Sequence, residues 1–326
     1  MILARAAVAA HHVLGGLGRR ATGFLAAGIF LGVLIPPAAA LARPLLTPAM
    51  ALLLLATVLR IEPNSLLASL QRRWLVAAAV LWALVVAPLL VVPAVAAAAV
   101  DPFLADHLVL TAASAPIIAA ASFALLLGLD AAFTLAAAVV ASALVPFTLP
   151  AIAGVLLGVA LPVEPPSLLL RLALLIGGAA AAATLIRRIL GAVAIRDAAP
   201  LIDGIVVVVL LVFGLAVMDG VTAALIGDPW FVLRCLAGAF ALAFGLFAAT
   251  SLLFVFLGLR MALTFGLLTG FSNFGVVVAA LGPAAEPATV VYLGLAQFPI
   301  YMLPILLRPV VSRLLAPRHE TDPRRW

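Results

Sequence analysis

The sequence contains no lysine and a single cysteine, and only 9% of its 326 residues are charged. A soluble domain carries about 25% charged residues, so a fold of this length solvated only by water is excluded. The lone Cys235 excludes a disulfide framework and a cysteine-based metal site. Phosphate-binding loops, zinc-protease motifs and serine-hydrolase motifs are absent as well. The composition therefore argues against an enzyme and predicts no cofactor.

What the chain has instead is apolar surface. Hydrophobic residues make up 67% of it, and the mean hydropathy is +1.37. A spanning helix takes roughly 20 residues plus a loop, which leaves room for about ten spans. We therefore predict an all-α integral membrane protein with ten transmembrane helices, whose solvent is the lipid bilayer. No long polar domain remains that could bind a nucleic acid.

The basic residues are all arginine, and they are distributed unevenly along the predicted spans. With the amino terminus inside, only Arg43, Arg171 and Arg234 fall on the outer side, which leaves 15 of the 18 basic residues inside. Inner loops of membrane proteins carry such an excess. We therefore expect both tails, residues 1–20 and 313–326, to be cytoplasmic in a bacterial-type inner membrane.

The chain also divides into two similar halves within one transmembrane domain. Residues 21–160 and 166–312 each hold about five predicted spans, and an odd number of spans inverts the second half relative to the first. The fifth and tenth spans each carry a proline pair, and proline kinks a helix. These pairs are Pro146 with Pro150 and Pro299 with Pro304. An inverted repeat is the predicted organisation.

The ninth span, residues 261–283, has small and polar residues at its centre. A spanning helix must satisfy every backbone N–H and C=O internally, so such a centre is a poor choice for a plain anchor. It predicts a helix that breaks at mid-membrane and turns backbone groups toward a cavity. The residues concerned are Thr269, Gly270, Ser272, Asn273 and Gly275.

The fourth span, residues 108–128, occupies the corresponding place in the first half. It carries Ser114, Pro116 and Ser122 near its centre. We predict a second break here, so that two discontinuous helices cross. The alternative is that these hydroxyls, like those of the ninth span, hydrogen-bond between continuous helices.

One further amide completes the candidates taken from the residues alone. Gln297 lies two residues before Pro299. A buried amide near a kink either binds substrate or caps carbonyls that the proline frees, and the sequence leaves both open.

The order and spacing of these features resemble the bile acid:sodium symporter family and its superfamily of auxin-efflux and arsenite-efflux carriers. The similarity covers residues 21–307. The second span ends in LLLATVLRIEPNSL, which is similar to the family's apolar-Gly-Leu-x-Leu-x-Pro turn, and the third has Pro88. Pro116 stands where the family has Pro-Gly-Gly before Ser-Asn. Gly270, Asn273 and Gly275 follow the frame Glu-x-Gly-x-Gln-Asn-x-Gly.

The resemblance implies a fold and an activity. The family has ten helices in two inverted repeats, with a core domain that contains the crossing helices. A panel domain is formed by the first two helices of each repeat. Sodium ions bind behind the crossing, and a small organic anion binds between core and panel. The implied function is secondary active transport, in which core and panel move against each other.

The same frame places different side chains at the family's ion ligands. Leu268 replaces the sodium-binding Glu and Ser272 replaces the Gln, while Thr134 keeps a hydroxyl in the fifth span. Burying a cation without a carboxylate is costly. Sodium thus stays an implication of the resemblance. The alternatives are a sodium-independent carrier, proton-coupled or facilitative, and a non-transporting membrane scaffold or sensor.

Overall fold

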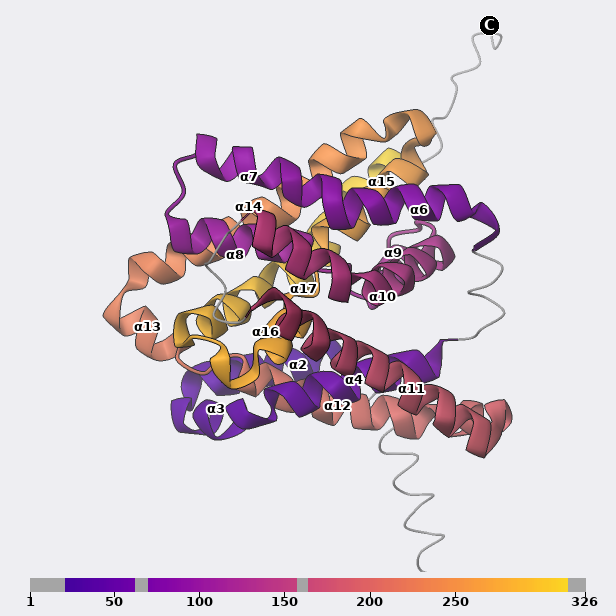
Figure 1. Cartoon of the computed structure of the whole chain (residues 1–326), viewed down its shortest axis with the longest axis horizontal. Helices are drawn as coiled ribbons and strands as arrows, with labels where there is room; N and C mark the ends of the chain where they lie inside the picture. Colours follow the sequence, from indigo (N-terminus) through magenta and orange to yellow (C-terminus); the bar gives the residue numbers. More distant parts are fainter. Residues whose placement is uncertain (1–20, 62–69, 157–163, 316–326) are drawn as a thin grey trace, which may run out of the picture.

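The computed structural model of the chain describes residues 21–61, 70–156 and 164–315, and these fold into helices (Figure 1). Among the described residues, six helices are long and apolar enough to cross a membrane, and several shorter apolar helices accompany them. The prediction of an all-α, multi-pass membrane protein is confirmed. Both predicted tails fall mostly outside the described residues, as does most of the RIEPNS turn.

Five helices form a lower group, at the bottom of Figure 1. Within it α12 packs against α2 and α4, and α11 packs against α4. Small residues allow close approach, because a Cβ added to Gly28 would lie 2.5 Å from the carbonyl oxygen of Leu211. The lower group comprises α2 (Ala21–Leu34), α3 (Pro36–Ala42), α4 (Leu46–Arg60), α11 (Pro165–Asp197) and α12 (Ala199–Ala216).

The remaining long helices form an upper group, which lies above the first in Figure 1. It contains one long helix made of α6 (Arg73–Leu81), a π-helical turn and α7 (Ala87–Ala97). The turn, Trp82–Val86, lies just before Pro88, where proline disturbs regular α-helical bonding. Its other members are α8 (Pro102–Ala113), α9 (Ala120–Leu126), α10 (Ala131–Leu156), α14 (Pro229–Leu253), α15 (Leu259–Gly270), α16 (Phe274–Leu281) and α17 (Pro287–Leu315). The short α13 (Val221–Gly227) connects the two groups.

One detail differs from the sequence-based expectation. Helix α8 begins at Pro102, six residues before the predicted start of the fourth span at 108, because Asp101 caps it by accepting a hydrogen bond from the Leu104 N–H at 3.1 Å. The prolines Pro146 and Pro299 lie inside α10 and α17, which continue through them. These two positions are therefore not interruptions of the helix.

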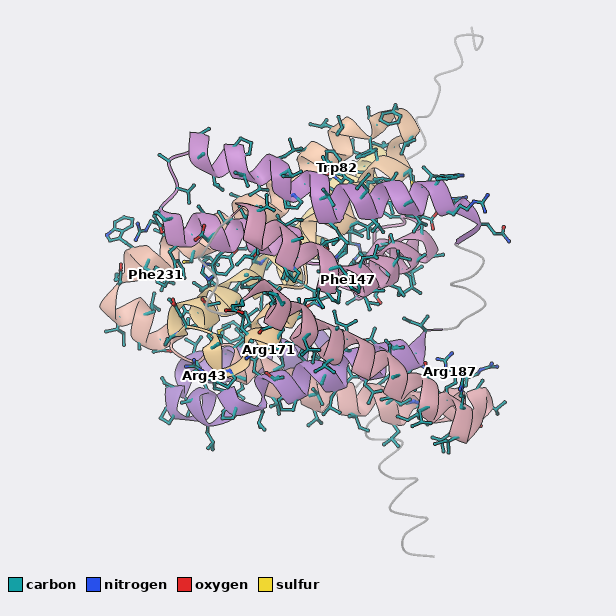
Figure 2. The ribbon with its side chains drawn as sticks, in the orientation of Figure 1. Arg43, Trp82, Phe147, Arg171, Arg187 and Phe231 are labelled. Atoms are coloured by element: carbon teal, nitrogen blue, oxygen red, sulfur yellow. The ribbon has the colours of Figure 1, made fainter. Side chains whose placement is uncertain are left out.

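Ion pairs lie at both ends of the helices. Arg43 pairs with Asp219 at 3.0 Å, and Arg234 with Asp101 at 3.8 Å. At the opposite end Arg60 pairs with Asp203 at 3.1 Å, and Arg72 with Asp130 at 3.0 Å. Each pair joins residues that the predicted alternation of spans places on one side. We call these the Arg43 end and the Arg60 end; in Figure 2, Arg43 and Arg171 lie toward the left and Arg187 at the right.

Candidate functional site

The first half of the site is an interruption between α8 and α9. Helix α8 ends at Ala113, and Ser114 adopts an extended backbone with φ −72° and ψ 148°. Pro116 has no N–H to continue a helical ladder, and it disfavours a helical residue before it. The chain becomes helical again at Ala120. The interruption lies where Pro116 predicts it.

The second half is a shorter interruption between α15 and α16. Helix α15 ends at Gly270, and Phe271 (φ −118°, ψ 80°) and Asn273 (φ −93°, ψ 64°) leave the helical conformation. Helix α16 begins at Phe274. This interruption also lies within the stretch that the sequence identifies.

The two interruptions cross and bond to each other through their backbones. The Ile117 N–H donates to the carbonyl of Phe271 at 2.8 Å, and the Asn273 N–H donates to the carbonyl of Ala115 at 2.8 Å. Pro116 and Ser272 thus form an isolated antiparallel bridge. Each break frees backbone groups that the other break satisfies, as the interior of a bilayer requires.

A cavity of about 370 Å³ lies beside this crossing, between the lower and upper groups. Its volume is within the usual range of small-molecule sites. The lining from the lower group is mainly apolar, and the residues along the two breaks supply most of the opposite wall. No lining residue is ionisable. The wall consists of Met50, Leu53, Leu54, Thr57, Ile117, Ile118, Ala119, Ser122, Phe123, Val206, Leu210, Phe213, Ser272, Asn273, Phe274, Gly275, Gln297 and Ile300.

Four of the predicted polar residues meet at this cavity. Ser122, Ser272, Asn273 and Gln297 all line it. Gln297 is only 4% exposed, and its amide nitrogen donates to the carbonyl of Leu293 at 3.2 Å. That carbonyl is not the one four residues before Pro299, so Gln297 does not cap the group that the proline frees. Thr57 of α4, which was not among the predicted residues, adds a hydroxyl oxygen from the lower group, and its hydrogen is donated to the carbonyl of Leu53 at 2.6 Å.

The other predicted polar residues turn away from the cavity. Thr269 donates to the hydroxyl oxygen of Thr250 on α14 at 2.9 Å, which is the helix-to-helix bond of the alternative interpretation. The hydroxyls of Thr134 and Ser114 donate to carbonyls four residues back, at 2.7 Å and 2.8 Å. Such local bonds are common for helical Ser and Thr. The structure does not bring these three hydroxyls together with Asn273 at the cavity.

Two glycines let the crossing sit tightly between its neighbours. A Cβ added to Gly275 would lie 2.5 Å from Cε of Met50 and 3.3 Å from Cζ of Phe213, both in the lower group. A Cβ added to Gly270 would lie 2.9 Å from the carbonyl oxygen of Ala243 on α14. Gly275 therefore sets the approach of α16 to the lower group, and Gly270 that of α15 to α14.

The residues at the implied sodium positions do not fit a sodium site. Leu268 is buried in the apolar core and has no ligand atom, and Thr134 contributes a single hydroxyl oxygen, whose hydrogen is donated to the Asp130 carbonyl. The Asp130 carboxylate itself is paired with Arg72. Among the residues that the structure describes, no cluster of three or more His, Cys, Asp or Glu side chains could hold a metal ion.

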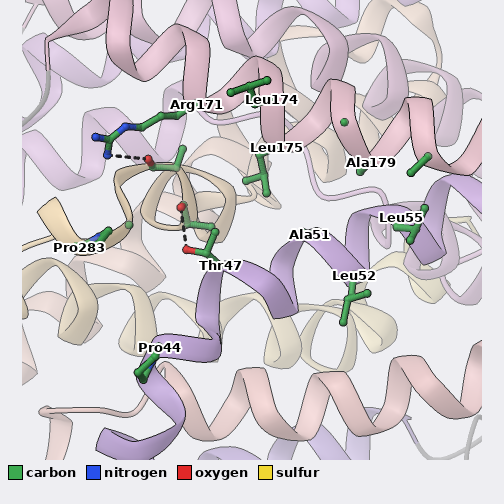
Figure 3. Close-up of a pocket in the computed structure, with 15 residues that line it drawn as sticks. Pro44, Thr47, Ala51, Leu52, Leu55, Arg171, Leu174, Leu175, Ala179 and Pro283 are labelled. Atoms are coloured by element: carbon green, nitrogen blue, oxygen red, sulfur yellow. Dashed lines mark hydrogen bonds between the residues drawn. The ribbon is translucent and has the colours of Figure 1, made fainter.

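At the Arg43 end, lower-group side chains bond across the interface to upper-group carbonyls (Figure 3). Arg171 donates to Leu281 O at 2.9 Å, and Thr47 donates to Ala279 O at 3.0 Å. Arg43 also reaches Ala285 O, at 3.5 Å. These three contacts hold the end of α16 and the turn after it against the lower group.

At the Arg60 end the polar contacts of the arginines stay within one group. Arg60 joins α4 to α12, and Arg72 joins the start of α6 to the start of α10. Arg187 of α11 donates to the carbonyls of Leu59 and Ile61 at 2.7 Å and 2.8 Å. A second hollow of about 370 Å³, lined in part by Arg187, continues from the cavity toward this end and shares Leu54 and Ile118 with it.

A further hollow is a groove of about 750 Å³ between α4, α11 and the end of α16 (Figure 3). It lies toward the Arg43 end, and Arg171 is its one ionisable lining residue. The arginine already donates to two carbonyls there. Neither break contributes to the groove, so the smaller cavity at the crossing is the candidate site.

Comparisons with known proteins add no constraint to this geometry. No protein-family model matches the chain, and no curated protein is similar to it at a significant level.

Proposed function

We propose that the protein is a secondary transporter of a small organic anion that works by alternating access. The observation that carries the proposal is the crossing of two interrupted helices at the wall of a cavity between two helix groups. Interrupted helices that expose backbone groups to a mid-membrane cavity are typical of such carriers. The proposal includes ten spans in two inverted repeats, with the upper group as core and the lower group as panel.

The cavity can bind an anion through several weak polar interactions, without a cationic side chain. Helix α16 begins at the cavity, and the amino end of a helix carries partial positive charge. The side chains of Asn273 and Ser272 and the amide of Gln297 provide hydrogen bonds. Because the lining contains no cationic side chain, we propose a substrate with one negative charge and a mainly apolar body. Water displaced from the apolar wall supplies most of its binding free energy.

The state of the molecule fits one stage of the cycle. Polar contacts join the groups at the Arg43 end, where the groove includes no residue of either break, whereas the hollows that include break residues lie toward the Arg60 end. By the excess of arginine on the inner side, the proposed state opens inward, with both termini in the cytoplasm. Transport then requires that the contacts of Arg43, Thr47 and Arg171 break while the Arg60 end closes.

The test is uptake of radiolabelled hexanesulfonate and benzenesulfonate into proteoliposomes. Sulfonates stay ionised, so they do not leak across the bilayer as neutral acids. We expect saturable uptake that Asn273→Ala lowers by roughly tenfold, the effect of losing a hydrogen bond to an anion. Ser312→Ala, which changes an exposed hydroxyl of α17, is the matched control and should leave uptake intact. Absence of flux for both probes in any gradient would contradict the proposal.

The coupling ion is a separate part of the proposal. Because Leu268 offers no ligand atom and Thr134 only one oxygen, we propose transport without sodium. Uptake should then be equal in sodium and choline buffers. A strict sodium requirement would overturn this part while leaving the transport proposal in place. The remaining alternative, a scaffold that does not transport, is disfavoured because the two helices are interrupted and a cavity lies between the groups.

A further inference from the structure

His107 is a buried titratable side chain that the proposed anion site does not use. It lies in α8, one of the interrupted helices, and is only 8% exposed. Its sequence context, between Asp106 and an apolar run, suggests an exposed loop. The capped start of α8 at Pro102 carries it into the protein instead. A change in the charge of this ring would therefore alter the energy of its contacts with the neighbouring helices.

Both ring nitrogens of His107 have a partner, and the partners define the tautomer. Nδ1 lies 2.7 Å from the carbonyl oxygen of Phe103, which can only accept, so Nδ1 carries the hydrogen. Nε2 lies 2.9 Å from the hydroxyl oxygen of Thr289 on α17. In the neutral ring Nε2 accepts from that hydroxyl. The free electron pair of His107 is thus directed at α17.

An aromatic cluster connects this histidine to the crossing. The ring of His107 stacks on Phe103 with centroids 4.0 Å apart, and it contacts the edges of Tyr292 at 5.2 Å and Phe274 at 6.1 Å. Phe274 is the first residue of α16 and lines the cavity. Tyr292 in turn shares a hydrogen bond of 3.0 Å with Thr111 of α8. One ring therefore separates His107 from the cavity.

We propose that His107 binds the proton that is coupled to anion transport; this inference rests on the transport function proposed above. The proton adds to Nε2, and the ring becomes a cation with two N–H donors. The hydroxyl of Thr289 must then turn its hydrogen away and accept from Nε2. No other bond forms or breaks. Thr289 lies four residues after Ala285, whose carbonyl accepts from Arg43 of the lower group.

The direction of the coupling follows from the cost of burying a charge. An imidazolium enclosed by aromatic rings lacks water, and an unsolvated charge is costly. Protonation therefore favours the conformation that admits water from the Arg43 end. The carboxylates near the ring offset part of that cost without removing it. The ionisable groups nearby are Asp101 and Asp106 on or beside α8, Arg234 and Cys235 on α14, and Glu286 and Tyr292 on or beside α17; α7, α10 and α16 carry none.

The test measures opening of the Arg43 end and needs no substrate. Ala285→Cys is introduced into a Cys235→Ala background, which removes the single native thiol. Its reaction with a membrane-impermeant maleimide is measured in proteoliposomes at each pH. Each rate is divided by that of the unfolded protein at the same pH, which cancels the titration of the thiol itself. Ala285 is buried, so fast labelling reports that the Arg43 end has opened.

With His107 present, we expect the normalised rate to rise by roughly tenfold from pH 8 to pH 5, the range in which histidine titrates. With His107→Gln, whose amide keeps a hydrogen-bonding group near Thr289 but cannot titrate, the rate should not depend on pH. Equal pH dependence in both proteins would overturn the proposal. Glu286→Gln and Asp101→Asn should move the midpoint without abolishing the response; loss of the response in either would also overturn it.

A second variant keeps the proposal testable if His107→Gln does not fold. Thr289→Val removes the hydroxyl that accepts from the charged ring, a stronger bond than the one it donates to the neutral ring, so the midpoint should move to lower pH; an unchanged midpoint would contradict the proposal. An acid-outside gradient should also drive hexanesulfonate uptake with His107, but not with His107→Gln, which should still exchange the anion at equal pH. If the labelling rate depends on pH through His107 but no anion flux is detected, the transport proposal fails while the protonation of His107 stands. If flux is detected but labelling does not depend on pH, only the proposal for His107 fails.

Discussion

The two ends of the interface between the helix groups are held in different ways. At the Arg43 end, side chains of the lower group donate to carbonyls at the end of α16 and just after it. At the Arg60 end, Arg60, Arg72 and Arg187 bond within their own group, and hollows lie between the groups. Among the described residues, one end is therefore closed by bonds that cross the interface, whereas the arginine contacts at the other end stay within one group.

The difference indicates that the free-energy gap between the closed and open conformations of the Arg43 end can be small. A hydrogen bond contributes about 0.5–1.5 kcal/mol net, and one from a charged group about 1.5–3 kcal/mol. Three such contacts amount to a few kcal/mol, which is the size of the gap between conformations that exchange readily. The carbonyl groups released when these contacts break can accept hydrogen bonds from water, so little hydrogen-bonding free energy is lost. The closed end can thus open without unfolding any helix.

The largest effect is expected at Gly275, midway between the ends. Gly275→Leu would press on Met50 and Phe213 and force the groups apart at both ends, since overpacking costs about 1–3 kcal/mol. We expect a lower melting temperature and loss of sulfonate uptake. Gly245→Leu on α14, where an added Cβ meets nothing within 4 Å, is the matched control. Normal uptake by Gly275→Leu would show that α16 does not need this close approach.

The next largest effect comes from comparing two arginines of α11, one at each end of the interface. Arg171→Ala removes a charged donor that crosses the interface, so labelling of Ala285→Cys should rise by roughly tenfold, equivalent to about 1.4 kcal/mol. Arg187→Ala removes the same type of bond from the other end of α11, where it stays within the lower group. It should leave this labelling unchanged. An equal response to both substitutions would remove the distinction between the ends.

A smaller effect is expected from the neutral contact at the same closed end. Thr47→Val keeps the shape of the side chain and removes one hydroxyl bond to Ala279 O. Labelling of Ala285→Cys should increase about threefold to fivefold, in line with roughly 1 kcal/mol. The measurement is the same maleimide rate at fixed pH. If Thr47→Val exceeded Arg171→Ala, the arginine would not be the main contact of the closed end.

The smallest effect is expected at the Arg60–Asp203 pair. Both side chains are about two-fifths exposed, at 43% and 41%, so the pair is screened by solvent. Such pairs contribute about 0–1 kcal/mol. Thermal unfolding in detergent should show that Arg60→Ala shifts the melting temperature by no more than a few degrees. A shift comparable to that of Gly275→Leu would mean that this end is also held by its ion pairs.

The positions of the breaks could be predicted because their signals are local. Proline at 116 and the cluster of glycine, serine and asparagine at 270–275 act on the backbone of their own segment. The repeat also predicted that the two breaks cross, but the particular bonds between Ile117 and Phe271 and between Asn273 and Ala115 could not be predicted, because they use backbone groups that every residue has.

The directions of single side chains were harder to predict. Thr269 and Asn273 are separated by about one helical turn, yet Thr269 faces α14 while Asn273 faces the cavity, and only tertiary packing decides between them. Arg171 looks like an outer-side charge but donates to the carbonyls that end α16. His107 was missed because the acidic residues before it suggest solvent, whereas Asp101 serves as the cap of α8.

The antiparallel bridge between Pro116 and Ser272 has a consequence for how the sequence can change over time. The bonds of the bridge are made by peptide groups, so the joint places almost no demand on side-chain identity beyond a proline or small residue that interrupts each helix. Residues on the cavity side of the joint can then change while the joint persists. A protein built in this way can preserve its architecture long after its sequence has diverged.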